Sequence, residues 1–371
     1  MAVLEIQNLN KSYGQNLVLR DINLTVPEGE FFVVLGPSGG GKSTLLRVLC
    51  GIEPADTGVI SLAGREITHL PPRERNIGMV FQDYGLYPHM NAWDNIAYGL
   101  EARKMPKNMI EERIKTAAEK LGITPLLQRV IVDLSGGEQQ RVALARALAK
   151  DADLYLFDEP LSNLDPKLRV QARRDILMVH REKHKPTLYV THDQTEALAS
   201  GDRIGIIARG QLQQVGTADD LIQHPANTFV ASFIGSPSMN LVTATLAFDS
   251  DRNAYTVQFA GQVPVRLPAH WNDRLSAYNK TAVVLGIPAT AFLLGNTEAS
   301  ANAGGYVQGE VENEEGLIGE IIVMFKIEEG TSLAAIFQSM DDLEFPIGSS
   351  IRLGIDSEQL SLFDFQTETA L

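Results

Sequence analysis

Short apolar runs alternate with stretches of helical periodicity along the first 235 residues of the chain. The runs are rich in Val, Ile, Leu and Phe and are bounded by Gly, Pro, Asp or Asn, which is typical of strands. The predicted strands are residues 3–9, 22–26, 31–35, 59–62, 77–81, 154–157, 187–190 and 203–208. The predicted helices are residues 42–50, 107–121, 138–150, 166–183 and 194–199. This alternation predicts an α/β domain with a largely parallel sheet.

Two changes of pattern divide the chain further. The stretch from about residue 82 to residue 134 has no strand pattern, so we expect an inserted helical subdomain over about residues 82–150. After Gly235 short strands dominate, and such strands at close spacing are typical of a small β-barrel. The predicted strands there are residues 241–248, 254–260, 263–267, 282–287, 319–327, 351–355 and 360–362. We therefore expect an α/β domain over residues 1–235 and an all-β domain over residues 236–371, joined near a Gly/Ser/Pro-containing linker at 235–240.

Composition narrows the class of protein. Hydrophobic residues make up 44% of the 371 residues and charged residues 21%, which indicates a globular chain rather than a disordered or fibrous one. The apolar runs fall far short of the roughly 18 residues that a membrane-spanning helix needs. Lys11 and Arg20 interrupt the start before a signal-peptide core forms, and a single cysteine, Cys50, excludes a disulfide framework. We expect a cytoplasmic protein.

Charge is distributed unevenly between the two expected domains. Residues 1–240 hold 26 Lys and Arg against 28 Asp and Glu, whereas residues 241–371 hold 6 against 18. Neither part has a basic run, which argues against a nucleic-acid partner. The acidic C-terminal part is interpreted as a solvated surface, with a docking surface for a basic partner as the alternative.

A glycine-rich motif follows the apolar run 31–35 and precedes the predicted helix 42–50. It satisfies the pattern G-x-x-x-x-G-K-[ST] and consists of Gly36, Pro37, Ser38, Gly39, Gly40, Gly41, Lys42, Ser43 and Thr44. Glycines let successive backbone N–H groups surround a phosphate, and a helix start adds a favourable dipole. Lys42 can then reach the β- and γ-phosphates, and the Ser43 hydroxyl can coordinate Mg²⁺. The motif predicts a nucleotide-phosphate site rather than a glycine-rich turn with a chance lysine.

Two further motifs gain their meaning from this one. The apolar run 154–157 ends in Asp158 and Glu159, which are suited to hold Mg²⁺ and to deprotonate an attacking water, respectively. Residues 134–141 read LSGGEQQR and place Ser135 and two glycines at a helix start, a second place where an anion can bind. Alone, acidic residues at a strand end and a Ser-Gly-Gly turn are ordinary. In one chain with a phosphate loop they indicate an ATP hydrolase.

The order of these motifs resembles that of the ATP-binding cassette (ABC) transporter ATPases. The phosphate loop, LSGGEQ and LFDEP are followed by SNLD at 162–165 and VTHD at 190–193, and the match covers about residues 1–235. The segments FQDY at 81–84 and LYPHM at 86–90, with the β-rich tail, are most similar to the maltose-type carbohydrate importer ATPases. The resemblance implies a P-loop ATPase fold followed by an OB-like (TOBE-type) domain that acts in dimerisation or regulation.

The resemblance also implies roles for residues that carry no signal of their own. Tyr13 would stack on adenine, although a buried strand tyrosine is the alternative. Gln82 would sense the metal and the attacking water, and His192 would contact the γ-phosphate, although a lone histidine at a strand end more often has a structural role. The remaining implied ATP contacts are Ser135, Gly136, Gly137, Gln139 and Asp165. Of these, Ser135 and Gly137 would bind the γ-phosphate held by the other subunit, so catalysis would need a head-to-tail dimer.

The function predicted from these observations is ATP hydrolysis that drives solute uptake through a membrane importer. The cofactors are ATP and Mg²⁺, with Ser43, Gln82 and Asp158 as the metal site and Glu159, His192 and Gln82 as the catalytic set. The expected partners are a second copy or a close paralogue, two transmembrane permease subunits and, indirectly, an extracytoplasmic solute-binding protein. The chain would lie at the cytoplasmic face of the cell membrane. Carbohydrate is the favoured cargo; polyamine, ferric-ion and inorganic-anion importers and a non-transport ABC protein are the alternatives.

Overall fold

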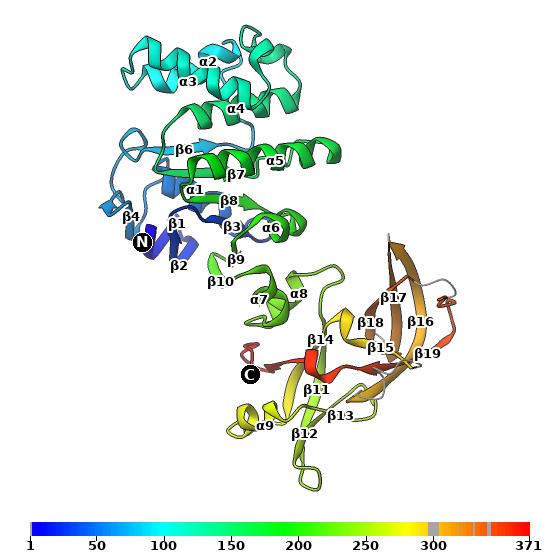
Figure 1. Ribbon diagram of the computed structural model, residues 1–371. Coiled ribbons are helices and arrows are strands. Elements are labelled where there is room, and N and C mark those ends of the chain that lie inside the picture. Colours follow the sequence, from blue (N-terminus) through cyan, green and yellow to red (C-terminus); the bar gives the residue numbers. More distant parts are fainter. Residues whose placement is uncertain (1, 296–303, 318, 329–330, 340–342) are drawn as a thin grey trace. The chain divides into compact units, whose positions relative to one another are not determined.

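The computed structural model describes residues 2–295, 304–317, 319–328, 331–339 and 343–371 and divides the chain into two compact units (Figure 1). The first unit runs to Ala218 and the second from Asp219 to Leu371. Within these described ranges, no helix is both long enough and apolar enough to cross a membrane.

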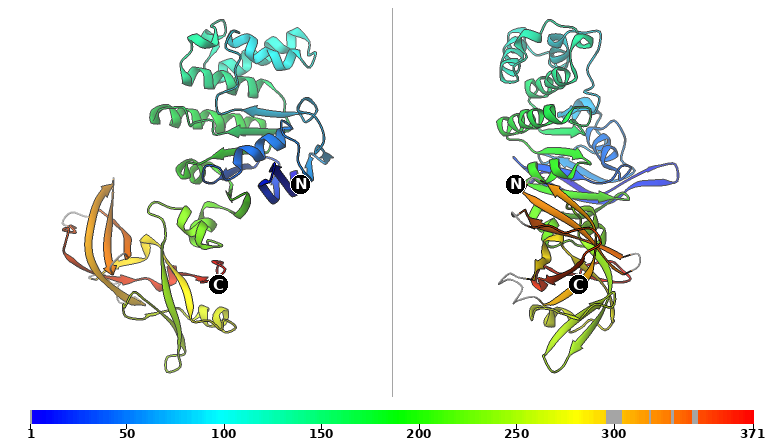
Figure 2. Two further views of the ribbon diagram at one scale, coloured as in Figure 1. Left: turned by 180° about the vertical axis from the view of Figure 1, so that it is seen from behind. Right: turned by 90° about the vertical axis from the view of Figure 1, so that its right-hand side faces the viewer.

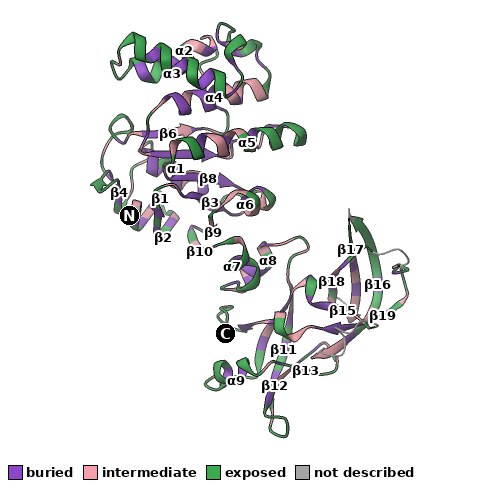
Figure 3. Ribbon diagram, viewed as in Figure 1, coloured by how far each residue is buried: buried purple, intermediate pink, exposed green. Residues whose placement is uncertain are grey.

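A six-stranded sheet forms the centre of the first unit. Its order is β10-β9-β3-β8-β7-β6, and all neighbours are parallel except β10 and β9. The strands are β3 (Phe31–Leu35), β6 (Ile77–Val80), β7 (Leu154–Asp158), β8 (Thr187–Thr191), β9 (Arg203–Ala208) and β10 (Gln211–Gly216). Every residue of β3, β7 and β8 is buried (Figure 3), as expected for parallel strands covered on both faces. The predicted parallel α/β sheet is confirmed.

A second, antiparallel sheet covers one side of this layer. It contains β1 (Ala2–Tyr13), β2 (Asn16–Pro27), β4 (Thr57–Leu62) and β5 (Arg65–Glu66), in the order β2-β1-β4-β5. Helix α1 (Lys42–Cys50) shares one apolar core with both sheets, because Leu45, Leu46 and Leu49 pack in the same cluster as Ile6 and Leu156. The α1 helix is thereby held firmly at the position where its N-terminus follows β3.

Helices account for the stretch between β6 and β7. They are α2 (Ala92–Glu101), α3 (Lys107–Lys120) and α4 (Gly136–Ala149), which pack together beyond β6 (Figure 1 and Figure 2). The sequence pattern had not indicated α2, which begins where the Asn91 side chain accepts a hydrogen bond from the Asp94 N–H. Two more helices follow β7 and β8 and are α5 (Pro166–Lys183) and α6 (Gln194–Ser200).

The second unit holds two five-stranded antiparallel sheets around one apolar core. The first sheet contains β13 (Val265–Arg266), β12 (Ala254–Phe259), β11 (Asn240–Asp249), β14 (Ala282–Ile287) and β20 (Ser361–Asp364). The other contains β15 (Phe292–Leu294), β19 (Ser350–Ile355), β16 (Gly305–Leu317), β17 (Glu320–Glu328) and β18 (Thr331–Gln338). The described part of the tail also contains the short helix α9 (His270–Leu275), which the sequence pattern did not indicate. The predicted all-β tail is confirmed.

The two units divide after Ala218, earlier than the boundary at residue 235 expected from the sequence. Helices α7 (Ala218–Gln223) and α8 (Thr228–Phe233) lie between these two positions. The Thr228 N–H donates to the carbonyl of Glu368 at 3.0 Å, and the Ala370 N–H donates to the carbonyl of Ala226 at 2.9 Å. The last residues of the chain thus tie α8 to the β-rich tail, although its helical pattern is like that of the preceding domain.

Candidate functional site

The carboxyl ends of four neighbouring strands carry most of the residues singled out from the sequence. Strands β3, β8, β7 and β6 lie side by side and parallel, with Leu35 opposite Thr191 and Asp158 opposite Val190. The phosphate loop, His192, Glu159 and Gln82 each follow one of these ends, so the register places all four at one edge of the sheet. This is the edge at which open parallel sheets bind ligands.

The phosphate loop needs its glycines for steric reasons. A Cβ on Gly36 would lie 2.1 Å from the carbonyl oxygen of Ile207, so a side chain is excluded there. Gly41 has φ 106° and Gly39 has φ 77°, values that L side chains rarely adopt. The Gly40 N–H donates to the carbonyl of Pro37 at 3.1 Å, which closes the turn before α1 begins at Lys42. The loop therefore delivers consecutive N–H groups to the N-terminus of a helix, the arrangement that binds phosphate.

Lys42 reaches back across this loop. Its Nζ atom donates to the carbonyls of Gly36 and Pro37 at 2.9 and 3.0 Å and lies 3.7 Å from Oε1 of Glu159. The side chain is buried, and burial lowers the pKa of Lys42 while the carboxylates of Glu159 and Asp158 oppose that change. The two carbonyl oxygens carry only partial negative charges. A phosphate in the loop would place a full negative charge beside the Lys42 ammonium.

Ser43 and Asp158 meet although 115 residues separate them in the chain. The Ser43 hydroxyl donates to Oδ1 of Asp158 at 2.9 Å. Asp158 is buried, which raises its pKa, and the hydrogen bond from Ser43 acts in the opposite direction. Hydroxyl and carboxylate oxygens are ligands that suit Mg²⁺, which keeps several waters and otherwise binds phosphate oxygens. Within the described residues, no group of three or more His, Cys, Asp or Glu side chains is arranged to hold a metal ion. Ser43 and Asp158 are the residues that would hold Mg²⁺ here, together with phosphate and water.

Glu159 is held between a lysine and a histidine side chain. Oε2 lies 3.0 Å from Nδ1 of His192, and Oε1 faces Lys42. The backbone of Glu159 has φ 43° and its N–H donates to the carbonyl of Val190 at 3.0 Å. A non-glycine residue in this conformation is uncommon and is often found where function requires it. The Glu159 carboxylate is thus oriented at the sheet edge next to the phosphate loop.

A buried hydrogen-bond network next to His192 was not predicted from the sequence. The hydroxyls of Tyr189 and Thr191 both donate to Oε2 of Glu196, at 2.8 and 2.9 Å. Thr191 also accepts from the Asp193 N–H at 3.0 Å. This network fixes the turn that contains His192, because it ties β8 to the start of α6. Asp193 accepts a hydrogen bond from the Glu196 N–H at 3.2 Å and caps α6, the helix predicted over residues 194–199.

Gln82 is fixed to the loop that follows β7. Its side-chain amide nitrogen lies 3.5 Å from the Ser162 hydroxyl, and its backbone carbonyl accepts a hydrogen bond from the Asn163 side-chain amide at 2.9 Å. Ser162 in turn donates to the carbonyl of Glu159 at 2.9 Å. The segments that carry Gln82 and Glu159 are therefore coupled directly.

The LSGGEQ segment lies in the helical subdomain. Ser135 caps α4 in a capping box, in which its N–H and hydroxyl both donate to Oε2 of Glu138 at 2.8 Å. These bonds hold the pKa of Glu138 below its usual value. Ser135 and Gly136 are exposed, whereas the Gln139 amide donates to the carbonyls of Ile131 and Leu134. The helix start is open to a ligand, and Gln139 has a structural role in shaping it.

Two other predicted contacts lie at element ends. Asp165 caps α5 by accepting from the N–H groups of Lys167 and Leu168 at 3.1 and 3.0 Å. Tyr13 ends β1 with 43% of its surface exposed, and the Lys11 ammonium lies 5.2 Å from its ring centre. The exposed ring rules out the alternative of a buried strand tyrosine.

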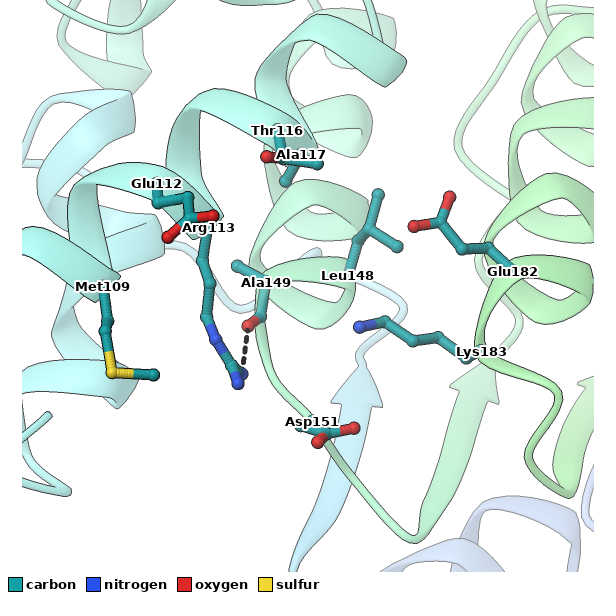
Figure 4. A pocket seen from close by; sticks show the side chains of 10 residues that line it. All are labelled: Met109, Glu112, Arg113, Thr116, Ala117, Leu148, Ala149, Asp151, Glu182 and Lys183. Atoms are coloured by element: carbon teal, nitrogen blue, oxygen red, sulfur yellow. Dashed lines mark hydrogen bonds between the residues drawn. The ribbon is translucent and has the colours of Figure 1, made fainter.

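A separate hollow of about 370 Å³ lies among α3, α4 and α5 (Figure 4). Arg113 donates to the carbonyl of Ala149 at 3.3 Å there, and Lys183 points into the hollow, where burial lowers its pKa. The carboxylates of Asp151 and Glu182 lie on the same hollow and balance these cations. None of the predicted nucleotide residues lines it.

The chain is similar in sequence and in fold to several known proteins. A family model described as ABC transporter matches residues 19–162. The sn-glycerol-3-phosphate import ATP-binding protein UgpC of Yersinia pseudotuberculosis is 46% identical over 276 residues, which cover 74% of this chain and 77% of the relative. An uncharacterized ABC transporter ATP-binding protein of Bacillus subtilis, YurJ, is 38% identical over 375 residues, which cover 100% of both chains. The solved structure of cbiO1 from Clostridium perfringens, part of the ABC transporter complex cbiONQ, matches with a TM-score of 0.55 and 26% identity over 59% of this chain and 90% of that one.

Proposed function

Because the chain belongs to the ATP-binding proteins of ABC transporters, we propose that it hydrolyses ATP at the edge of its parallel sheet to drive solute import. The observation that carries the proposal is the meeting of Lys42, the Ser43–Asp158 pair and the Glu159–His192 pair beside the phosphate loop.

Each residue of this set has a distinct task. Lys42 and the loop N–H groups bind the β- and γ-phosphates, and Ser43 and Asp158 hold Mg²⁺, with Gln82 beside them. When bound, Mg²⁺ neutralises phosphate charge. Glu159 accepts the proton of the attacking water, and His192 holds the carboxylate in place through its 3.0 Å contact. Tyr13 stacks on the adenine.

The exposed start of α4 is proposed to complete the site of a second subunit. Ser135, Gly136 and Gly137 present a helix N-terminus that is fixed by the capping box and can meet a γ-phosphate. Asp165 lies at the start of α5 and faces the same seam in this proposal. Two copies, or one copy and a close paralogue, would then enclose two ATP molecules head to tail.

The permease partners are proposed to dock on a groove next to the loop of residues 81–91 between β6 and α2, which we call the Gln82 loop. The groove has a volume of about 290 Å³ and is lined by residues of the loop, α2 and α4, among them Phe81, Tyr87 and Tyr98. Tyr87 and Tyr98 are 37% and 48% exposed, and their rings lie 4.8 Å apart. Exposed aromatic side chains around a hollow are typical of protein interaction sites. A cytoplasmic segment of a membrane permease fits this chemistry and would hold the chain at the inner face of the membrane.

The cargo is proposed to be a carbohydrate or a related polyol. The relatives from Yersinia are named for the import of sn-glycerol-3-phosphate, a phosphorylated polyol. Polyamines, ferric ion and inorganic anions are the alternatives, because the cargo is selected by the permease and its binding protein and not by this chain.

The proposal is tested by comparing the chain with its Lys42→Ala variant in two assays. The purified wild-type protein should hydrolyse ATP in a Mg²⁺-dependent manner and the variant should not. Cells that lack the protein should lose uptake of one labelled solute, screened among sugars, sn-glycerol-3-phosphate, spermidine, ferric ion and phosphate, and only the wild type should restore it. Restoration of uptake by Lys42→Ala would contradict the proposal. If the cells lost only polyamine or ion uptake, the proposed carbohydrate cargo would be wrong.

A further inference from the structure

The Gln82 loop and α4 each contribute one buried side chain whose polar atoms form no hydrogen bond in the described structure. Among the described residues, the Tyr84 hydroxyl and both amide atoms of Gln140 are buried and have no hydrogen-bond partner. Tyr84 is 6% exposed and Gln140 is 1% exposed. We call these two side chains the unsatisfied pair. A buried polar group without a partner is costly, so each such case calls for a physical reason.

One distance and the geometry of a helix place both side chains of the unsatisfied pair at the first turns of α4. The Tyr84 hydroxyl lies 3.9 Å from the point that a Cβ on Gly136 would occupy. Gln140 follows Gly136 by one helical turn on the same face of α4, and helical side chains lean toward the N-terminus of their helix. The Gln140 amide therefore lies over the turn that the Tyr84 hydroxyl approaches.

The backbone around Tyr84 is anchored to the other half of α4. Arg146 donates to the carbonyls of Tyr84 and Gly85 at 2.8 and 2.6 Å. Tyr84 has φ 65° and Gly85 has φ 56°, so this turn is held in a conformation that a tyrosine rarely adopts. Arg146 thus acts as a fixed point, and a small tilt of α4 about it would move Gln140 and the Ser135 end relative to the Tyr84 ring.

Hydrogen bonds also connect the turn at Tyr84 with the segment that carries Glu159. Ser162 binds the carbonyl of Glu159, and Asn163 binds the carbonyl of Gln82, two residues before Tyr84. The Gln82 side chain points to Ser162, whereas the Tyr84 hydroxyl approaches the first turn of α4 at Gly136.

We propose that Tyr84 and Gln140 are positioning residues for ATP hydrolysis, whose hydroxyl and amide hydrogen-bond to each other when α4 tilts against the Gln82 loop. The pairing favours the tilted arrangement, because it satisfies groups that are unsatisfied before the tilt. The position of the Ser135 end of α4 thereby depends on how the segments that carry Gln82 and Glu159 are arranged. The inference rests on the proposed ATPase function and adds a coupling element to it.

The experiment uses the full-length chain with Tyr84→Phe, Gln140→Met and both together. Each substitution keeps the shape and removes the unsatisfied group, so the nucleotide-free protein should melt about 2–4 °C higher. The kcat for ATP should fall at least about threefold while KM stays within about twofold, because the nucleotide contacts are unchanged. The double variant should have the kcat of a single variant, since both changes remove one interaction.

A matched control separates this role from packing. Ser200 has a hydroxyl that is likewise buried and unpaired in the described structure, at the end of α6 and away from the Gln82 loop. Ser200→Ala should raise the melting temperature without changing kcat. Wild-type kcat in both Tyr84→Phe and Gln140→Met, or a lower melting temperature in either, would overturn the proposal.

A second readout keeps the test independent of turnover. In a Glu159→Gln background, ATP should drive a smaller fraction of dimer with Tyr84→Phe than without it, as measured by analytical ultracentrifugation. An unchanged dimer fraction would overturn the pairing. A wild-type chain that binds ATP without hydrolysing it would contradict the proposed function instead, and the dimer readout would still decide on the pairing.

Discussion

Glu159 combines several features that a catalytic base requires. Its backbone has φ 43°, its two carboxylate oxygens face Lys42 and His192 separately, and it follows the buried strand β7 directly. The strand fixes the position of the carboxylate, and Lys42 and His192 fix its rotation. The residue is therefore oriented for proton transfer before a substrate arrives.

Glu159→Gln should retain ATP binding and lose turnover. The amide keeps the shape of the side chain but accepts no proton, and a general base contributes about 10²–10⁴-fold to the rate. We expect kcat to fall by that factor while the dissociation constant for Mg²⁺-ATP changes less than about threefold, measured by steady-state kinetics and calorimetry. Glu182→Gln, on the surface of α5, is the matched control and should have wild-type kcat. Turnover within tenfold of wild type would exclude Glu159 as the base.

Lys150 supplies a pH-dependent contribution to stability. It donates to the carbonyl of Ile77, and burial lowers its pKa to about 8 from 10.5. Between these two values the unfolded chain binds more protons than the folded one at this residue, so the free energy of unfolding rises with pH. That contribution is complete above pH 10.5 and is lost as the pH falls from 10.5 to about 8.

Lys150→Met should remove this contribution. We expect the difference in unfolding free energy between wild type and Lys150→Met to grow in favour of the wild type from pH 8 to pH 10, by at most about 1.4 kcal/mol per pH unit. Urea unfolding at several pH values measures it. Two curves that run parallel across this range would show that Lys150 titrates normally in the folded protein.

At the scale of elements, α4 connects three parts of the first unit. Its start carries the capping box of Ser135, its middle carries Gln140, and its last turns carry Arg146, which binds the Gln82 loop. The helix packs against α2, α3 and α5. A change at the exposed start should therefore affect a partner subunit without altering the phosphate loop of the same chain.

Ser135→Arg should block hydrolysis while leaving nucleotide capture by the same chain intact. The bulky cation would occupy the helix start proposed to meet the γ-phosphate of the other subunit, whereas Lys42 and its glycines are unchanged. Ser135→Asn is the control for folding, because Asn caps a helix as well as Ser does. Equilibrium binding of a fluorescent ATP analogue should match wild type for both variants.

Mixing Ser135→Arg with Lys42→Ala subunits sharpens this test. In a head-to-tail dimer one composite site then carries both lesions and the other carries neither, so part of the ATPase activity should return. Loss of ATP binding by Ser135→Arg as severe as that of Lys42→Ala would place Ser135 in the pocket of its own chain.

At the scale of the whole molecule, the division after Ala218 makes a specific prediction about fragments. A fragment of residues 1–218 contains the whole parallel sheet and every proposed nucleotide residue. It should bind Mg²⁺-ATP with a dissociation constant within about tenfold of the full chain, or about 1.4 kcal/mol, measured by calorimetry.

A fragment of residues 1–236 is the matched comparison. It retains α7 and α8 but lacks the tail segment around Glu368 and Ala370 that binds α8. Apolar side chains such as Leu221 and Val230, buried in the full chain, would be exposed in it. The longer fragment should therefore aggregate more than the shorter one in light scattering. A folded 1–218 fragment that fails to bind ATP would show that the tail helps build the nucleotide site.

The sequence by itself determined the elements whose physics is local. The apolar run Phe31–Leu35, the glycines after it and the helix that begins at Lys42 predict a phosphate loop, because each needs only its own neighbours to adopt its conformation. The order of LSGGEQ, LFDEP and the histidine segment then indicated the family. Strands such as β14 (Ala282–Ile287) and helices such as α5 followed from periodicity alone.

Only the tertiary structure decided which of these residues meet and where the chain divides. Ser43 and Asp158 are 115 residues apart, and Glu159 and His192 are 33 apart, so their contacts exist only because β3, β8 and β7 are neighbours in the sheet. The strand β16 (Gly305–Leu317) escaped prediction because its exposed face is rich in Glu and its apolar face is completed by other strands. Helix α8 belongs to the tail unit because backbone hydrogen bonds connect it to the last residues of the chain, and no pattern of side chains predicts such bonds. The unsatisfied pair of Tyr84 and Gln140 likewise follows from the packing of two distant segments, because burial is a property of the fold and not of either residue.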